Sequence, residues 1–328
     1  MTAPSWTPEP EVEVLDLRHF SAANLRPLLD EEKEVWSSRL AWDYRSSAEM
    51  ILRYVEGKIL PGYVALHHGQ VDGYTFFVYE GSKGVIGDLY VSPGRPAQHG
   101  IERRLLNHTI ATLQQSPGIH RVEAQLLLHE TDAVSAIFLQ EGFRQYRRLF
   151  MMHRLQPFSG PQTMDANLRL PSDLEIRRWS DGDYQAAAAV INEAYRGHID
   201  AEINDQYRST QGSLRFLNNI VRFPGCGTFD NQASFVAFHR PSRTVIGLVL
   251  CSKVKESVGH VTQICLLPEY RGRGVGQLLL RMTTTELRRR NYHAITLTVT
   301  EANAGAVRLY KSLGYEVHHV FDAFVWQG

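Results

Sequence analysis

The chain has 328 residues, 43% of them hydrophobic, and its 35 basic and 35 acidic residues cancel to a formal net charge of zero. This length and composition predict two domains with cores of their own and exclude a disordered chain. The charge balance argues against a general nucleic-acid binder. The first residues lack a signal-peptide pattern, and no apolar run approaches the ~20 residues of a membrane span. We therefore expect a cytoplasmic protein with no nucleic-acid or membrane partner.

Cysteine is rare in the chain, with Cys226, Cys251 and Cys265 as its three positions. Their number is odd, and their spacing fits neither a zinc site nor a disulfide framework. We expect buried thiols in a reducing cytoplasm and no metal site.

Two stretches of the chain repeat one order of predicted elements. Each reads strand, loop rich in glycine and arginine, helix, strand and helix, first over residues 85–143 and again over residues 261–315. Pro93 and Pro268 end the first strand of each copy and lie 175 positions apart, whereas Gly142 and Gly314 near the ends lie 172 apart. A near-constant offset over consecutive elements indicates duplication of one domain.

The predicted domains are residues 1–155 and residues 173–328, and the segment 156–172 between them reads as a linker. Residues 156–167 of this segment are rich in proline, glycine and polar residues, a composition typical of connections between domains.

The second copy shows the periodicities most clearly. Ile295, Leu297 and Val299 alternate with threonines, which predicts a strand, and apolar residues at a spacing of three and four predict a helix from Val275 onward. A strand, helix and strand of this length normally form a right-handed parallel crossover. Ahead of this unit the sequence predicts helices over 183–195 and 214–221 and strands over 233–238 and 245–251. We therefore predict an α/β fold, with a mixed, mostly antiparallel sheet flanked by helices in each domain.

The loop between the first strand and the helix of the second copy carries the strongest functional pattern. It consists of Arg271, Gly272, Arg273, Gly274, Val275 and Gly276. A helix N-terminus offers free N–H groups and the positive end of the helix dipole, and alternating glycines let the backbone approach a phosphate closely. A tight surface turn is the alternative without chemistry. A dinucleotide-binding loop is disfavoured, because its Gly-x-Gly-x-x-Gly spacing and its usual place at the start of a domain are both missing.

The run from Leu267 to Gly276 resembles the acetyl-CoA signature of the GNAT superfamily of N-acetyltransferases. Downstream, Asn303, Ala306, Tyr310 and Gly314 stand at the spacing of the second signature of that family. The resemblance covers the C-terminal half strongly and the N-terminal half weakly. The chain is thus similar to tandem members of the superfamily in which the N-terminal copy is degenerate.

The resemblance implies a sheet in which a parallel strand pair splays apart, with acetyl-CoA bound in the opening. It implies that pantetheine contacts the backbone of Ile264, Cys265 and Leu266, that the pyrophosphate lies on Arg271–Gly276, and that Asn303 contacts the cofactor. The acetyl group would move directly from the thioester to an amine, and the matching tyrosine, Tyr310, would protonate the departing thiolate.

Helical spacing agrees with that role of Tyr310. Asn303 and Tyr310 lie seven residues apart, about two turns and ~10 Å along one face of a helix. A phenol at this place can act as a general acid. The alternative is a half-buried packing aromatic.

A general base is harder to find. The strand before the loop carries no carboxylate, and His260 has the same strand parity as Ile264 and Leu266, so we expect it to face the same side. Its ordinary pKa near ~6.5 suits a base, and Glu256 is a rival. A purely structural histidine is the alternative for His260.

The first copy lacks the residues of the signatures. Its asparagine and tyrosine positions fall on Thr131 and Phe138, and its loop contains Pro96 and Glu102. Proline removes an N–H donor, a carboxylate repels pyrophosphate, and phenylalanine has no proton to donate. We expect a degenerate domain with a structural or substrate-shaping role.

These patterns favour an acetyl-CoA-dependent N-acetyltransferase that acts on a primary amine of a small molecule or a peptide. The alternative is a catalytically silent regulatory protein that binds acyl-CoA, and the glycine loop argues against a pure interaction scaffold. Acidic and aromatic residues between 195 and 229 could hold a cationic amine, or they could belong to a solvated surface helix: Tyr195, His198, Asp200, Glu202, Asp205 and Tyr207.

Overall fold

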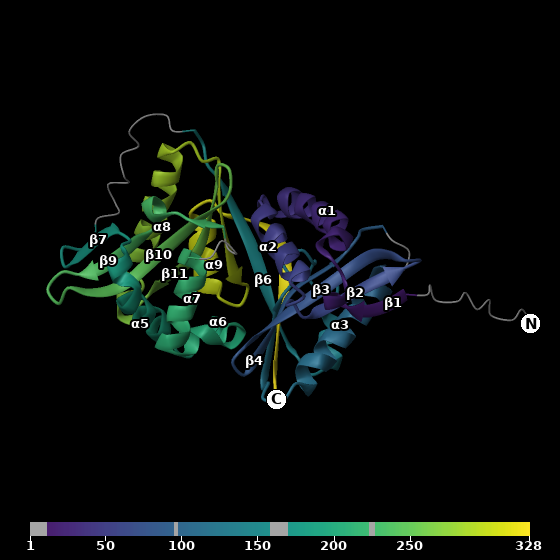
Figure 1. Cartoon of the computed structure of the whole chain (residues 1–328). Helices are drawn as coiled ribbons and strands as arrows, with labels where there is room; N and C mark the ends of the chain where they lie inside the picture. The colour runs from purple at the N-terminus through teal and green to yellow at the C-terminus, as the bar shows by residue number, and fades with distance from the viewer. Residues whose placement is uncertain (1–11, 95–97, 158–169, 223–226) are drawn as a thin grey trace, which may run out of the picture. The chain divides into compact units, whose positions relative to one another are not determined.

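The structure is a computed structural model, which describes residues 12–94, 98–157, 170–222 and 227–328. The chain divides into two compact units. Unit 1 consists of residues 1–35, 47–145 and 322–328, and unit 2 consists of residues 36–46 and 146–321. Figure 1 shows the course of the chain through both.

The sheet of unit 1 has the strand order β1, β2, β3, β4, β5 and the end of β13, and only the β4–β5 pair is parallel. The elements of the first half of the chain are β1 (Val12–Asp16), α1 (Ala22–Leu40), α2 (Arg45–Glu56), β2 (Gly62–His67), β3 (Gln70–Glu80), β4 (Lys83–Val91), α3 (Gln98–Gln115), β5 (Arg121–Gln125) and α4 (Ser135–Gln140).

The sheet of unit 2 repeats this order with β7, β9, β10, β11, β12 and β6, and only the β11–β12 pair is parallel. The short strand β8 adds to β10. The remaining elements are β6 (Arg144–Arg154), β7 (Leu174–Arg178), α5 (Tyr184–Ala194), α6 (Ile199–Ile203), α7 (Thr210–Arg222), β8 (Thr228–Phe229), β9 (Phe235–His239), β10 (Thr244–Lys255), β11 (Val258–Leu266), α8 (Val275–Arg289), β12 (Ala294–Thr300), α9 (Ala304–Ser312) and β13 (Glu316–Gln327).

The two units exchange their last strands. Strand β6 comes from the first half of the chain, yet it pairs along the whole of β12 in unit 2. The end of β13 comes from the second half, yet residues 323–327 pair with β5 in unit 1. The compact units therefore differ from the predicted domains 1–155 and 173–328 at both strands and at residues 36–46, which belong to unit 2. Most of the predicted linker, residues 158–169, lies outside the described residues, as do Pro96 and Cys226.

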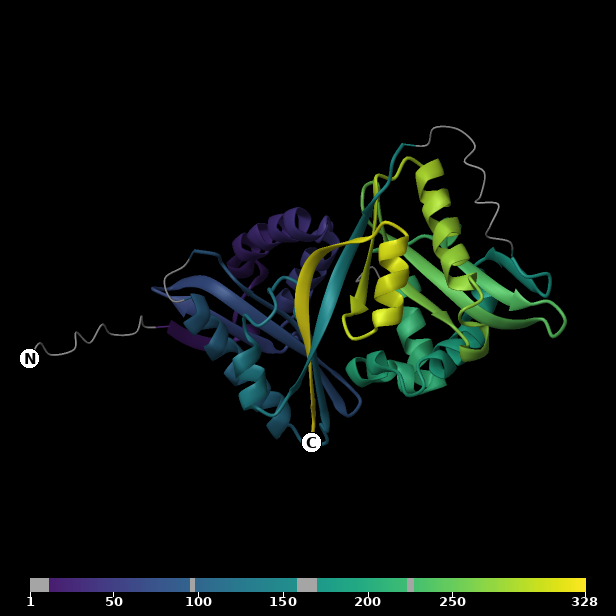
Figure 2. The same cartoon turned by 180° about the vertical axis from the view of Figure 1, so that it is seen from behind.

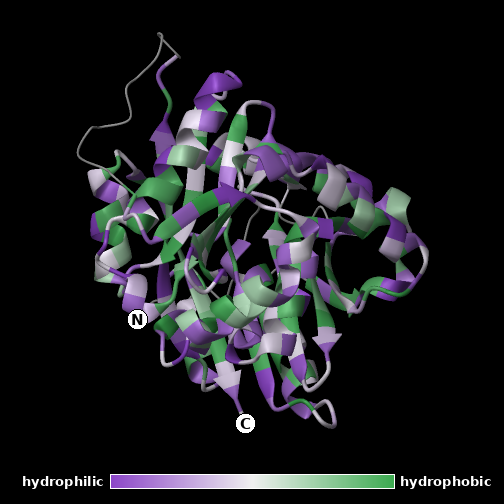
Figure 3. Ribbon diagram, turned by 90° about the vertical axis from the view of Figure 1, so that its left-hand side faces the viewer, coloured by the Kyte–Doolittle hydropathy of each residue, from purple (hydrophilic) through white to green (hydrophobic). Residues whose placement is uncertain are grey.

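Helices cover both faces of the unit 2 sheet. One core cluster joins α8 and α9 to the sheet, and a second joins α5 and α7 to its other face. In Figure 1 α5, α6 and α7 lie in front of the sheet, and in the opposite view of Figure 2 α9 lies in front. Figure 3 shows helices banded with polar and apolar residues, as expected when one side of a helix packs on a sheet.

The predicted fold class is confirmed, because each unit has a mixed sheet with one parallel pair and flanking helices. The helix from Val275 spans Val275–Arg289, and the strand predicted from the alternation of threonines spans Ala294–Thr300. Short elements without a clear period were not predicted, among them α6 and β7. No described helix is long and apolar enough to cross a membrane.

A β-bulge recurs at the same place in both units. In unit 2 Leu250 pairs with Gln263 while Cys251 pairs with Val261, so Thr262 is the extra residue. In unit 1 Phe76 pairs with Asp88 while Phe77 pairs with Ile86, so Gly87 is the extra residue. The two bulges lie 175 positions apart, the same offset as the two prolines that follow, and this supports duplication of the fold.

The exchanged end of β13 should be essential to unit 1. Phe324 is fully buried and stacks on Phe138 with a centroid distance of 4.0 Å, so Phe324→Ala should cost about 3–5 kcal/mol of unfolding free energy. Hydrogen exchange should rise in α4 and β5 and stay unchanged in β10 and α8. The matched control is Val317→Ala on the exposed first part of the same strand. Faster exchange throughout unit 2 but not in unit 1 would contradict the exchange of strands.

Candidate active site

The parallel strands β11 and β12 separate after four residue pairs. The pairing runs from Val258 with Ala294 to Val261 with Leu297 and then stops. Beyond this point β11 still pairs with β10, as far as Leu266. The Ile264 N–H donates to the side-chain oxygen of Gln263 at 2.9 Å. The splayed parallel pair expected at the cofactor site is therefore present in unit 2.

The loop after β11 has the backbone conformation that its glycines predict. Gly272 and Gly274 have φ angles of 74° and 78°, and Gly274 is the N-cap of α8. A Cβ at either glycine would meet no atom within 4 Å, so the left-handed conformation, and not crowding, requires glycine there. The first bond of the helix runs from the Leu278 N–H to the Gly274 carbonyl at 3.0 Å. The N–H groups of Val275–Gln277 precede it and suit a phosphate.

The two arginines of the loop have protein partners. Arg271 donates to the Ala194 carbonyl at 2.6 Å and thereby ties the loop to the end of α5. Arg273 donates to both carboxylate oxygens of Asp173 at 3.0 Å, and this bond lowers the pKa of Asp173. The arginines therefore add positive potential and hold the loop, whereas the backbone offers the donors.

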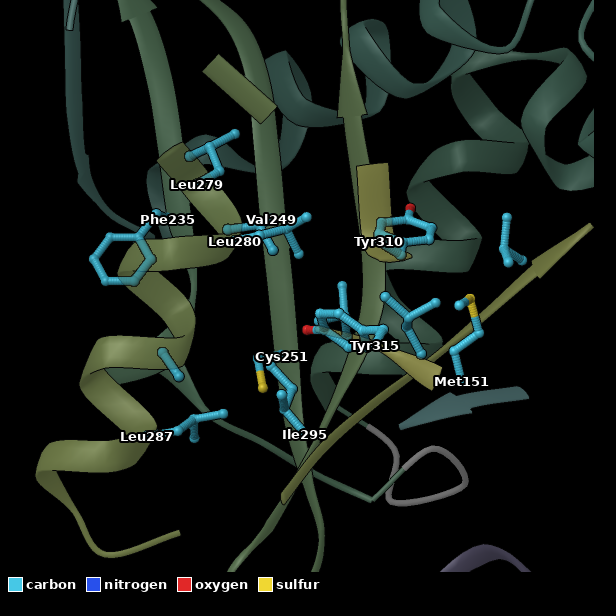
Figure 4. Close-up of a cluster of buried hydrophobic side chains, with 14 of the residues drawn as sticks. Met151, Phe235, Val249, Cys251, Leu279, Leu280, Leu287, Ile295, Tyr310 and Tyr315 are labelled. Carbon is cyan, nitrogen blue, oxygen red and sulfur yellow. The ribbon is translucent and has the colours of Figure 1, made fainter. Parts of the chain in front are cut away.

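Tyr310 and Asn303 come from α9, as the second signature predicts. Tyr310 is buried at the edge of the core cluster of Figure 4, with its hydroxyl directed away from Tyr315 and Met151. Burial raises its pKa well above the usual value of a tyrosine, and the nearby Asp200 adds to this. Asn303 is the N-cap of α9, and its oxygen accepts from the Ala306 N–H at 3.2 Å.

The bulge reverses the predicted face of His260. Ile264 lies opposite Val249, on the side of α8 and α9, whereas His260 lies opposite Ser252, on the face that Gln263 and Cys265 share. The expectation that His260 faces the same side as Ile264 and Leu266 is therefore wrong, because the extra residue Thr262 shifts the alternation by one.

The surroundings of His260 also argue against a general base. The ring lies 5.0 Å from that of Trp42 and 5.9 Å from that of Phe150, and Nδ1 is 2.9 Å from the Thr296 hydroxyl. Burial lowers its pKa to about 3. The rival Glu256 is exposed and stands eight residues before Ile264, about 26 Å along an extended strand.

Cys265 packs with α5 and α7 on one face of β11, while Ile264 and Leu266 pack with α8 and α9 on the other. Burial raises the pKa of the Cys265 thiol to about 12, and that of Cys251 beyond the usual range of a thiol. Both described cysteines are buried and free, as predicted.

A polar cluster lies where β12, α9 and the end of α5 meet. Arg148 of β6 donates to Asp200 at 2.8 Å and to the Thr300 hydroxyl at 2.7 Å, and Thr300 in turn donates to Asp200. Asn303 Nδ2 lies 3.3 Å from Nε2 of His198. Nothing in the local sequence pattern marks Arg148, because its partners are more than 50 positions away.

Gln263 of β11 also belongs to this polar cluster. Its side-chain oxygen accepts from the Tyr195 hydroxyl at 2.8 Å as well as from Ile264, so this atom is the oxygen of the amide. Its buried Nε2 has no hydrogen-bond partner among the described residues. A buried donor of this kind is costly unless a ligand or water accepts from it.

The corresponding positions of unit 1 have other residues and other partners. Glu102, expected in the loop, is instead buried within α3, with its carboxylate 3.1 Å from His99 and 3.2 Å from Gln98. Phe138 is fully buried against Phe324, and Thr131 donates to Asp322 at 3.0 Å. Within the described part of unit 1, the asparagine and tyrosine positions are taken by Thr131 and Phe138, whose partners Asp322 and Phe324 belong to the same unit.

The region of the chain that contains this site matches a known protein family. Residues 201–315 match the model of the Acetyltransferase (GNAT) family, a range that includes β11, the glycine loop and α9. This region of the chain is a GNAT acetyltransferase domain. Acetyl-CoA is the acyl donor of that family, so the predicted enzyme class and cofactor are confirmed at the level of the family.

Relatives with known names align with both halves of the chain. A mycothiol acetyltransferase of Thermomonospora curvata is 28% identical over 77% of this chain and 77% of its own length. That of Thermobispora bispora is 26% identical over 77% of this chain and 83% of its own length. This agrees with the tandem layout expected from the repeat.

Solved structures share the fold of the chain. A GCN5-related N-acetyltransferase from Sphaerobacter thermophilus has a TM-score of 0.67 at 18% identity and covers 98% of this chain and 97% of its own. A tandem GNAT protein from the clavulanic acid biosynthesis pathway has a TM-score of 0.58 at 15% identity, with 97% and 98% covered.

The buried imidazole of His260 should leave a signature in the pH dependence of stability. Between about pH 6.5 and pH 3, His260 binds a proton in the unfolded chain but not in the folded chain. The free energy of unfolding therefore falls as the pH falls through this range. The slope is at most about 1.4 kcal/mol per pH unit. His260→Gln should flatten the change between pH 7 and pH 5 in urea titrations, whereas His293→Gln, at an exposed histidine, should not. Equal slopes in all three proteins would show that His260 titrates normally.

Proposed function

We propose that unit 2 transfers an acetyl group from acetyl-CoA to a primary amine of a small molecule. One observation carries this proposal. The N-terminus of α8 has free N–H groups next to a left-handed glycine, and it follows, after the loop of residues 267–274, a strand whose parallel neighbour has separated from it. This arrangement offers donors for a pyrophosphate and an open strand edge for the amides of pantetheine.

The loop and the strand would bind different parts of acetyl-CoA. The N–H groups of Val275–Gln277 would hold the pyrophosphate, and Gly272 and Gly274 allow the loop its shape. The backbone of Ile264, Cys265 and Leu266 would pair with pantetheine, since this part of β11 has no partner in β12. Asn303 would fix the start of α9, and through it the place of Tyr310.

Tyr310 has the properties of a general acid. Its raised pKa keeps the phenol protonated at neutral pH, so that a proton is available for the sulfur of the departing thiolate. Its hydroxyl points out of the apolar cluster, away from the side chains that bury the ring.

A small molecule is favoured over a peptide as the acceptor. Relatives that align with about three quarters of the chain are named mycothiol acetyltransferases, after a small molecule. The alternative of a silent acyl-CoA-binding protein would need neither Tyr310 nor a polar cluster beside it. Release of thiol from acetyl-CoA with a panel of glucosamine, cysteine methyl ester, spermidine and a short peptide separates the two functions.

Gly274→Glu should abolish acetyl-CoA binding. The substitution forces a side chain into a left-handed backbone and places a carboxylate beside the pyrophosphate. Calorimetry should give one acetyl-CoA per chain for the wild type and none for the variant. Glu102→Gln in unit 1 is the control and should leave both numbers unchanged. A stoichiometry of two in the wild type would show that unit 1 also binds.

Tyr310→Phe should lower kcat while acetyl-CoA affinity changes little. The phenol is needed when the thiolate leaves and not when the cofactor binds, so the loss falls on the transition state. We expect a loss of about 10²-fold, measured as thiol release with the best amine of the panel. Tyr315→Phe, at a neighbouring buried tyrosine, controls for packing. Unchanged kcat in Tyr310→Phe would reduce Tyr310 to a packing residue.

A further inference from the structure

His198 stands at the polar cluster of unit 2, between β11 and α9. It is the N-cap of the short helix α6, and a quarter of its side chain is exposed. Its ring lies 5.3 Å from that of Tyr195, whose hydroxyl reaches Gln263 at 2.8 Å and the Ile264 carbonyl at 3.5 Å. Nε2 of His198 lies 3.3 Å from Asn303, at the start of the helix that carries Tyr310. The imidazole is therefore next to both elements of the proposed reaction centre.

Asp200 lies on the other side of the imidazole. Its Oδ2 is 3.4 Å from Nδ1 of His198, and its Oδ1 accepts from Arg148 at 2.8 Å. Arg148 comes from β6 and is mostly buried, as is Asp200. The ion pair and the bond from Thr300 hold the carboxylate in place. This is the arrangement in which a carboxylate orients a histidine and stabilises the imidazolium.

Each ring nitrogen of His198 faces a hydrogen-bond donor. The Asp200 N–H donates to Nδ1 at 3.1 Å, and the amide nitrogen of Asn303, whose oxygen is engaged with Ala306, lies 3.3 Å from Nε2. A neutral imidazole can accept at one of these two nitrogens only. In the tautomer with its proton on Nδ1, next to the Asp200 carboxylate at 3.4 Å, Nε2 has the lone pair that a base needs.

We infer that His198 is the general base of acetyl transfer, an assignment that rests on the proposed function. The amine nitrogen forms a bond to the thioester carbonyl carbon, and the bond from that carbon to sulfur breaks. The proton that the nitrogen loses goes to Nε2 of His198, and the thiolate takes its proton from Tyr310. Asp200 and Arg148 position the imidazole, and the ring of Tyr195 also faces it. His260 and Glu256 cannot serve. His260 is enclosed by Trp42 and Phe150, and Glu256 precedes β11 at the end opposite Ile264.

The test compares His198→Gln and His198→Ala with wild type in the full chain. We expect kcat with the best amine of the panel to fall by about 10²-fold or more in both variants, while the acetyl-CoA dissociation constant in calorimetry stays within about 2-fold. Added imidazole should restore part of the rate of His198→Ala and none of that of Tyr310→Phe. His293→Gln is the matched control, because His293 precedes β12 at the end opposite Thr300, about 20 Å away.

Each outcome decides the assignment. Wild-type kcat in His198→Gln would overturn it and leave the acetyltransferase proposal intact. Loss of acetyl-CoA binding in both variants would make His198 a structural residue and would also overturn it. A slow His198→Ala enzyme that imidazole does not accelerate would assign it a role in positioning and not in proton transfer. Absence of turnover by the wild type with every amine would overturn the proposed function, and this inference with it.

Discussion

The divergence of β11 and β12 is the constraint on which the site depends. The two parallel strands pair over four residues and then separate, so the backbone after Val261 keeps one partner strand and loses the other. Unsatisfied backbone groups at a strand edge need a partner. In unit 2 side chains supply part of these partners: the Ile264 N–H, for example, donates to the side chain of Gln263. The loop, α8 and α9 all follow from strands that border this opening.

The bulge at Thr262 determines which side chains face the opening. It moves Gln263 and Cys265 to the face of α5 and places Ile264 and Leu266 against α8 and α9. The Tyr195 hydroxyl can therefore meet Gln263, and His260 turns toward Trp42 and Phe150 instead. One inserted residue thus places His260 on the face of Gln263 and Cys265, away from Ile264 and Leu266.

Duplication explains the symmetry of the two units and their difference in chemistry. Both have the same strand order, the same parallel pair and a bulge at the same offset. In unit 1 Phe138 stands at the position that the repeat gives to the tyrosine, and it stacks on Phe324. Because of the exchange of β6, the first half of the chain contributes a residue to the candidate site of unit 2. This residue is Arg148, which pairs with Asp200. Neither half of the sequence contains the complete sheet of its own unit.

Local patterns in the sequence determined the glycine loop, helix α8, strand β12, and the spacing of Asn303 and Tyr310. Each depends on residues a few positions apart, and periodicity or turn chemistry records such relations directly. Tertiary structure alone decided the exchange of β6 and β13, the face of His260 and the partners of Arg148. A strand carries no local mark of which distant strand it will pair with, and a single bulge shifts the alternation of every residue after it. The contacts around His198 likewise join α6, β6, β12 and α9, so the residues were visible in the sequence while their arrangement was not.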